Sequence, residues 1–343
     1  MNVRWLSWVS IGLLLFIGIL IPYFLPPVYV NLASEILIFG LLAMSIDLLL
    51  GYTGLVPLGH AAIFGVAAYV VAYLNVRLGL PHTIVIPAGV ISALLISGVF
   101  GLLAVRTTGL HFMLITLAEG MLVWGLAYRW TSVTGSENGI SGITRPDFLI
   151  LSWQFYYAVL AIFTLCALIL FRIAQSPFGL SLRGIRDNES RMPMLGYNVT
   201  LHKFLAFLIS GGFAGIAGTL YALYNRFVSP AMVEFARSAE GVLMVILGGS
   251  GTLLGAVAGS ALIILIRNVV SLYTDRWLIV MGALFVLVIL FMPDGLIRGP
   301  GRIIASLQRA GGSWARYAIR LSGSRSPSVP TSEVPVPTNR DIP

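Results

Sequence analysis

The chain is a succession of long apolar segments separated by short polar ones. Ten apolar segments can be counted, and most of them approach the roughly 20 residues with which an α-helix crosses a hydrocarbon core of about 30 Å. They centre on residues 8–25, 32–50, 58–74, 83–104, 110–128, 153–173, 203–223, 239–249, 252–270 and 277–293. Because these segments do not alternate between apolar and polar residues, they do not read as barrel strands. The pattern predicts an all-α, polytopic transmembrane helical bundle.

Two segments need separate interpretation. Residues 8–25 follow Arg4, as in a signal peptide, but the run is long and lacks a small-x-small cleavage site, so we expect an uncleaved first helix. Residues 239–249 are too short for an upright span and are followed closely by the next segment. We expect a tilted short helix or a re-entrant piece, because such backbone is tolerated where protein surrounds it.

One long polar segment, Ala174 to Lys203, lies between two bilayer-length apolar segments. With Arg4 inside the cell, ten crossings place this segment and both termini in the cytoplasm. Fourteen of the 21 Lys and Arg residues then lie inside, as the positive-inside rule favours. The seven outside are Arg77, Arg129, Arg145, Arg226, Arg237, Arg267 and Arg276. Counting segments eight and nine as one span would instead leave the basic tail outside.

The composition separates a membrane domain, residues 1–299, from two tail regions. Residues 300–321 carry four arginines among apolar residues and are expected to form a basic amphipathic tail, whereas Ser/Pro-rich residues 322–343 read as disordered. Charged residues are only 10% of the chain, and its net charge of +8 fits lipid headgroups better than nucleic acid. One cysteine and four scattered histidines offer neither an internal disulfide nor a metal cluster.

Three stretches carry candidate function. In the first, GYTGLVPLGHAAIFGVAAY, glycines such as Gly51 and Gly54 allow either an irregular translocation pathway or simple tight packing of helices. Asp47, near the end of its segment, is expected to be structural or to border the pathway. His60, near a helix end, is expected to be a packing residue or to border the same pathway.

The second stretch places Glu119 near the middle of an apolar segment. A charge there costs roughly 2.5–3.5 kcal/mol, so such residues usually face a bundle interior or a wet cavity. Phe112, Thr116 and Glu119 are spaced four and three apart and share one helix face. We expect this face either to border the substrate pathway, with Glu119 meeting a cationic or amide group, or to hold a structural pair.

The third stretch is the polar segment itself. Leu182, Ile185, Met192 and Leu195 recur at near-helical spacing with charges between them, which predicts a short amphipathic helix over about Ser181 to Ser190 that lays its apolar face on a partner. Pro193 should end or break that helix. The alternative is a solvated loop held only by topology.

Six stretches, taken in order, resemble the permease subunits of branched-chain amino acid ABC importers, M-type (LivM-like). They are GYTGLVPLGHAAIFGVAAY, VRTTGLHFMLITLAEG, TSVTGSENGISGI, FGLSLRGIRDNE with LGYNV, FVSPAMVEFARSAEGVLMVILGGSGTLLGAVAGS, and MPDGLIRG. Pro57, Pro193 and Ala256 depart from the usual pattern of the family, as do Arg191 and Met192.

The resemblance implies a permease domain, not an enzyme, with no cofactor of its own. It implies a second permease subunit, two cytoplasmic ATPase subunits that use ATP, and a periplasmic or lipid-anchored substrate-binding protein. The chain lacks G-x-x-x-x-G-K-[ST], so it cannot itself be a P-loop ATPase. The implied ATPase coupling loop comprises Leu182, Arg183, Gly184, Ile185, Arg186, Asp187, Glu189 and Gly196.

The resemblance leaves the substrate open between branched-chain or other hydrophobic amino acids and urea or short amides. An alternative from another class is an ion-coupled secondary transporter that acts alone and uses Glu119 and Asp47 as proton sites.

Overall fold

The computed structural model describes residues 18–273, 279, 282–283 and 286. All of them lie within the unit Met1–Gly299. The two predicted tail regions, most of the first apolar segment and most of the tenth lie outside the described residues.

Helices account for eight of the ten predicted apolar segments. Seven helical segments in the described part are long and apolar enough to cross a membrane. They are α2 (Pro27–Thr53), α3 (His60–Ala72) with the π-helical turn η1 (Tyr73–Arg77), α4 (His82–Ala104), α5 (Gly109–Arg129), α7 (Ser152–Gln175), α9 (Val199–Asn225) and α11 (Leu253–Ser271). The eighth, α10 (Phe235–Gly248), is shorter at 14 residues. The expected all-α membrane bundle is thus confirmed, whereas a count of ten crossings is not.

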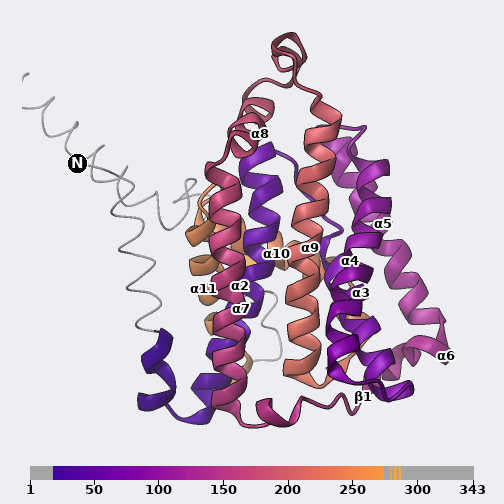
Figure 1. The fold of residues 1–343 in the computed structure, drawn as a ribbon, viewed down its shortest axis with the longest axis vertical. Coiled ribbons are helices and arrows are strands. Elements are labelled where there is room, and N and C mark those ends of the chain that lie inside the picture. The colour runs from indigo at the N-terminus through magenta and orange to yellow at the C-terminus, as the bar shows by residue number, and fades with distance from the viewer. Residues whose placement is uncertain (1–17, 274–278, 280–281, 284–285, 287–343) are drawn as a thin grey trace, which may run out of the picture. The chain divides into compact units, whose positions relative to one another are not determined.

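Short elements lie at the two ends of the bundle. Figure 1 shows α8 (Pro177–Asp187) at one end and β1 with α6 at the other. β1 (Ile140–Ser141) pairs antiparallel with β2 (Phe227–Val228). The remaining short elements are α6 (Thr131–Thr134), η2 (Ser136–Asn138), η3 (Asp147–Leu149), η4 (Glu189–Arg191), η5 (Pro193–Leu195) and η6 (Pro230–Met232).

Local sequence explains where these helices begin and end. Pro27 supplies the first residue of α2, and Gly54 ends it in the left-handed region with φ of 74°, where its N–H bonds to Leu49 O. At α8, Pro177 again starts the helix, and the Ser176 hydroxyl accepts a hydrogen bond from Gly179 N at 3.3 Å. Proline at the start and glycine past the end therefore mark both boundaries of α2.

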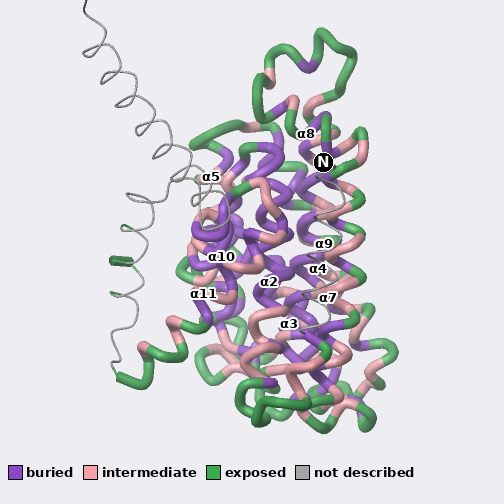
Figure 2. The backbone as a smooth tube through the Cα atoms, turned by 90° about the vertical axis from the view of Figure 1, so that its left-hand side faces the viewer, coloured by how far each residue is buried: buried purple, intermediate pink, exposed green. Residues whose placement is uncertain are grey.

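Helices α2, α3 and α9 form the buried centre, and exposed backbone gathers at the two ends of the bundle (Figure 2). In the most apolar stretch of α2, 83% of residues are buried, against 28% in α7. Small residues let α9 approach its neighbours closely: a Cβ added to Gly218 would lie 2.0 Å from Phe64 O, and one added to Gly215 would lie 2.2 Å from Ala93 Cβ. Close backbone approach of this kind is how helices pack inside membranes.

Candidate functional site: a polar centre and a helical end junction

The polar centre is the place inside the bundle where α3 and α10 begin. We define it by His60, Thr116, Glu119, Ser210 and Ser238. The Thr116 hydroxyl accepts a hydrogen bond from Leu58 N at 3.1 Å, which fixes the chain just before α3 against the middle of α5. The Ser238 hydroxyl accepts one from Ala61 N, also at 3.1 Å. Two helix starts therefore meet inside the protein, an arrangement that transporters use to line substrate sites.

His60 connects three helices. Its Nε2 lies 2.7 Å from Ser210 Oγ on α9, and that hydroxyl donates to Ser45 O on α2 at 2.5 Å. Because the Ser210 hydrogen is used in this way, Nε2–H of His60 is the donor in their bond. The ring also meets Phe207 edge-on at 5.5 Å. His60 is fully buried. It packs between helices, as expected of a packing residue, one of the two alternatives given above.

Phe112, Thr116 and Glu119 lie on the buried face of α5. The Glu119 side chain is 7% exposed, and neither carboxylate oxygen has a hydrogen-bond partner among the described residues. The opposite face of α5 exposes apolar side chains such as Leu114 and Leu122. A fixed partner for Glu119, the structural alternative, therefore finds no support in this part of the chain.

Asp47, Gly51 and Gly54 lie apart from the polar centre, along the last turns of α2. Asp47 Oδ1 accepts a hydrogen bond from Gly251 N at 2.7 Å, so it faces the turn between α10 and α11. Gly51 O accepts a hydrogen bond from Arg186 of α8. The predicted pathway residues thus separate into two groups, one in the centre and one at the α8 end.

The predicted amphipathic helix exists, but its bounds differ from the prediction. It begins at Pro177 rather than Ser181 and ends at Asp187, and the 3₁₀ turns η4 and η5 follow it. Pro193 starts η5, so no continuous helix runs through Leu195.

The prediction that Leu182, Ile185 and Met192 face a partner is wrong. All three are buried in this chain. α8 lays its apolar face, with Leu182 and Ile185, on α2, α7 and α9, and Met192 folds back beside Gly184 of the same helix. The most exposed apolar side chains of this segment are Met194, Leu195 and Leu180, at 87%, 70% and 60%. Helical spacing identified an apolar face correctly but assigned it to the wrong neighbour.

The charged residues of this loop hold it against the helices. The Arg183 guanidinium lies 4.8 Å from the Tyr52 ring centroid, and Lys203 Nζ lies 2.6 Å from Glu189 Oε1. A Cβ on Gly184 would lie 2.8 Å from the Met192 sulfur, and Gly196 has φ of 84°. Gly184 and Gly196 therefore allow the loop to fold back on α8.

No sequence pattern indicated the ion network that connects α2, α10 and α11. Arg267 of α11 bonds Glu35 of α2, and its Nη1 lies 3.1 Å from Glu240 Oε1 of α10. Arg237 Nη1 lies 2.6 Å from the other Glu240 oxygen. Both guanidinium groups lie over the Phe39 ring, at 5.4 and 5.6 Å. Arg237 and Arg267, which the charge count placed on the outer side, thus lie within α10 and α11.

Arg145 was also missed as a structural residue. Its Nε and Nη2 donate to Leu223 O and Tyr224 O at 2.8 and 2.9 Å, which satisfies carbonyls at the end of α9. Burial, reinforced by Arg226, lowers the pKa of Arg145 to about 10, so the group remains charged at neutral pH.

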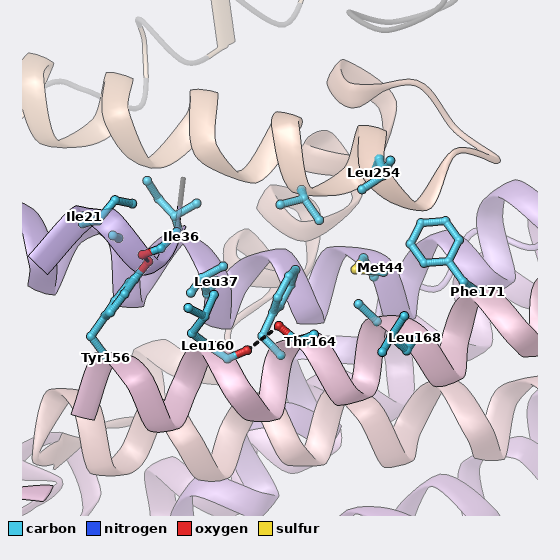
Figure 3. A pocket seen from close by; sticks show the side chains of 15 residues that line it. Ile21, Ile36, Leu37, Met44, Tyr156, Leu160, Thr164, Leu168, Phe171 and Leu254 are labelled. Carbon is cyan, nitrogen blue, oxygen red and sulfur yellow. Dashed lines mark hydrogen bonds between the residues drawn. The ribbon is translucent and has the colours of Figure 1, made fainter. Parts of the chain in front are cut away.

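A cavity of about 240 Å³ lies between α2, α7 and α11 (Figure 3). Its lining is apolar, with side chains such as Leu37, Leu160 and Leu254. Tyr156 and Thr164 already donate to backbone carbonyls. With its hydroxyl donors engaged in this way, the cavity suits hydrocarbon rather than a charged or strongly polar substrate.

A second cavity, also about 240 Å³, lies beside the end of α5 that is remote from α8. Stacked Trp124 and Tyr128 line it together with Glu137 and Glu234. Trp124 follows Glu119 by five residues, or about 7.5 Å along the helix axis. Aromatic rings and carboxylates together favour an ammonium group. No group of three or more His, Cys, Asp or Glu in the described residues could hold a metal ion.

Comparisons with known proteins place this arrangement among transport subunits. The family model described as "Branched-chain amino acid transport system / permease component" matches residues 28–289. The high-affinity branched-chain amino acid transport system permease protein LivM of Salmonella typhimurium is 28% identical and covers 83% of this chain and 73% of its own length. LivM of Escherichia coli is 27% identical with the same coverage. The autoinducer 2 import system permease protein LsrC of Salmonella paratyphi B is 26% identical over 52% of this chain and 53% of that protein. No solved structure matches the chain.

Proposed function

This chain belongs to the family of branched-chain amino acid transport system permease components, and we propose that it carries branched-chain or other hydrophobic amino acids into the cell. It is a permease subunit of an ABC importer, in a family of transport subunits rather than enzymes, and a multi-pass protein of the inner membrane. The family match over residues 28–289 carries the proposal, since it spans α8 and every helix of the polar centre.

The proposed substrate route follows the buried face of α5. The aromatic and acidic cavity near Trp124 receives the ammonium group, and Glu119 accepts it deeper in the bundle. Phe112 and Thr116 line the same face, and His60 holds the start of α3 in place. Asp47, Gly51 and Gly54 act at the α8 end of the route, where they contact moving helices rather than substrate.

The proposed docking surface for the ATPase consists of Leu180, Met194, Leu195 and the exposed charges Arg183 and Asp187. Three exposed apolar side chains beside charged ones resemble the apolar core and polar rim of a protein interface. Ion pairs at the edge of such a surface orient the partner more than they add affinity.

Family members are components of ABC transport systems, which implies ATPase and substrate-binding partners. The proposed assembly is this chain, a second permease subunit, two cytoplasmic ATPase subunits and a periplasmic or lipid-anchored binding protein. This chain holds no cofactor, and its partners use the ATP. Its other contacts are with membrane lipids and not with nucleic acid.

The proposed topology has about ten crossings with both termini in the cytoplasm. Seven spanning helices and α10 are supplemented by the first and tenth apolar segments. Cys166 is the only cysteine, so a Cys166→Ala background allows single-cysteine labelling from either side of the membrane. Labelling of a cysteine at Met194 from outside would contradict the proposed orientation.

Substrate class is tested with the cognate substrate-binding protein of this transporter. Calorimetric titration with leucine, valine, urea and acetamide should show tight binding of the amino acids alone, and the same ligands should compete for uptake by the intact transporter. Tight binding of urea or acetamide would favour the short-amide alternative. The LsrC relative, which imports a different kind of molecule, shows why this measurement is needed.

A further inference from the structure

Arg186 links α8 to two other parts of the bundle at once. Its guanidinium donates to Gly51 O in the last turn of α2. The same Nη1 would lie 3.5 Å from a Cβ on Gly251, in the turn between α10 and α11. We call Gly51, Gly54, Arg186 and Gly251 the α8 junction.

The backbones of the junction approach each other closely, although Gly54 and Arg186 are partly open to solvent. A Cβ on Gly51 would lie 2.2 Å from Gly251 N, and one on Gly54 would lie 2.9 Å from Arg186 Cγ. Asp47 Oδ1 also bonds Gly251 N at 2.7 Å, which ties the α10–α11 turn to α2. Because these segments are in such close contact, a movement of Arg186 displaces its neighbours.

The junction connects to the polar centre through two routes. Helix α10 leads from Gly248, beside the junction, back to Ser238, whose hydroxyl holds Ala61 at the start of α3. Helix α2 leads from Gly51 to Ser45, whose carbonyl receives the Ser210 hydrogen bond. Both routes are rigid helices, and such elements can transmit a displacement between sites.

The other charged side chains that anchor this loop, Arg183 and Glu189, each contact one helix. Arg183 stacks on Tyr52 of α2, and Glu189 pairs with Lys203 of α9. Arg186 differs because its side chain meets α2 and the α10–α11 turn together.

We propose that Arg186 is the positioning residue that transmits movement of α8 to α2 and to the α10–α11 turn, and so opens and closes the polar centre. The inference rests on the proposed function, in which a partner ATPase moves α8. A guanidinium suits this role because one flat group donates to Gly51 O while it lies against the α10–α11 turn, whereas a lysine ammonium is a compact point charge.

The test is the number of substrate molecules taken up per ATP hydrolysed, measured in proteoliposomes that contain the whole transporter. Arg186→Ala should lower labelled leucine uptake about tenfold, within the usual range of coupling between sites, while hydrolysis changes less than about twofold. Arg186→Lys should give an intermediate ratio. Arg172→Ala, which removes an exposed arginine near the end of α7, is the matched control and should retain the wild-type ratio.

Three results would overturn the role of Arg186. One is a wild-type uptake-to-hydrolysis ratio in Arg186→Ala. Another is a parallel fall in uptake and hydrolysis with loss of co-purifying ATPase, which would make Arg186 a docking contact. The third is failure of both Arg186→Ala and Arg186→Lys to accumulate, which would make it purely structural. Wild-type uptake is measured first, because its absence overturns the proposed function itself.

Discussion

Replacing Glu119 with Gln tests the polar centre because the two possible roles of this carboxylate predict opposite effects on stability. Breaking a buried ion pair by removing one partner costs about 3–5 kcal/mol. Glu119 has no partner among the described residues, and an ionised carboxylate in mid-membrane itself costs roughly 2.5–3.5 kcal/mol. Glu119→Gln should therefore leave the melting temperature unchanged or raise it.

The same substitution should impair transport. If Glu119 accepts a charge-assisted hydrogen bond from the substrate ammonium group, its loss removes about 1.5–3 kcal/mol. That energy corresponds to roughly a ten- to hundredfold change in affinity. The assay combines thermal melting of the purified transporter with the concentration dependence of leucine uptake, corrected for membrane abundance.

Asp147→Asn serves as the control, because Asp147 is an exposed acidic residue outside the membrane helices. It should change neither measurement. A lower melting temperature or abundance for Glu119→Gln, with normal uptake per remaining molecule, would refute the assignment and restore the structural pair.

Three other substitutions test the packing and the docking surface. Arg267→Ala leaves two largely buried carboxylates, Glu35 and Glu240, without this cation. It should destabilise the protein by about 3–5 kcal/mol, measured by thermal melting. An unchanged melting temperature would show that the ion network is dispensable. Gly218→Val places a side chain against Phe64 O and should lower the stability of the fold by at least about 1–3 kcal/mol, seen as reduced abundance in the membrane. Full abundance would contradict the close approach of α3 and α9. Met194→Asp should reduce co-purification of the ATPase without changing the melting temperature of this chain, and undiminished co-purification would exclude Met194 from the docking surface.

Hydropathy predicted the membrane helices well because the bilayer imposes a length on apolar segments. α4, predicted over 83–104, occupies His82–Ala104, and α5, predicted over 110–128, occupies Gly109–Arg129. The exact start of α8 was less predictable. Ser176 caps α8 and Pro177 is its first residue, so the helix begins before the amphipathic pattern from which it was predicted.

Contacts between distant segments account for most of what the sequence could not predict. Arg267 and Glu35 are 232 positions apart, and no local pattern indicates that they meet. The inward apolar face of α8 was recognisable, but periodicity describes a face and not the surface that covers it. In contrast, Phe112, Thr116 and Glu119 lie on one buried face, since spacings of three and four fix that relation within a single helix.

A substrate route through the polar centre requires an energy source that sets the direction of transport. Glu119 could serve either an amino acid moved by ATP or a proton moved by a stand-alone carrier. These alternatives require the same buried carboxylate but differ in the need for partner ATPases.

The most direct measurement is therefore labelled leucine uptake into proteoliposomes loaded with ATP and containing the whole transporter and its binding protein. Uptake should require ATP, stop when the P-loop lysine of the partner ATPase is replaced, and resist an uncoupler. Uptake by this chain without ATPase subunits, collapsed by the uncoupler, would contradict the account.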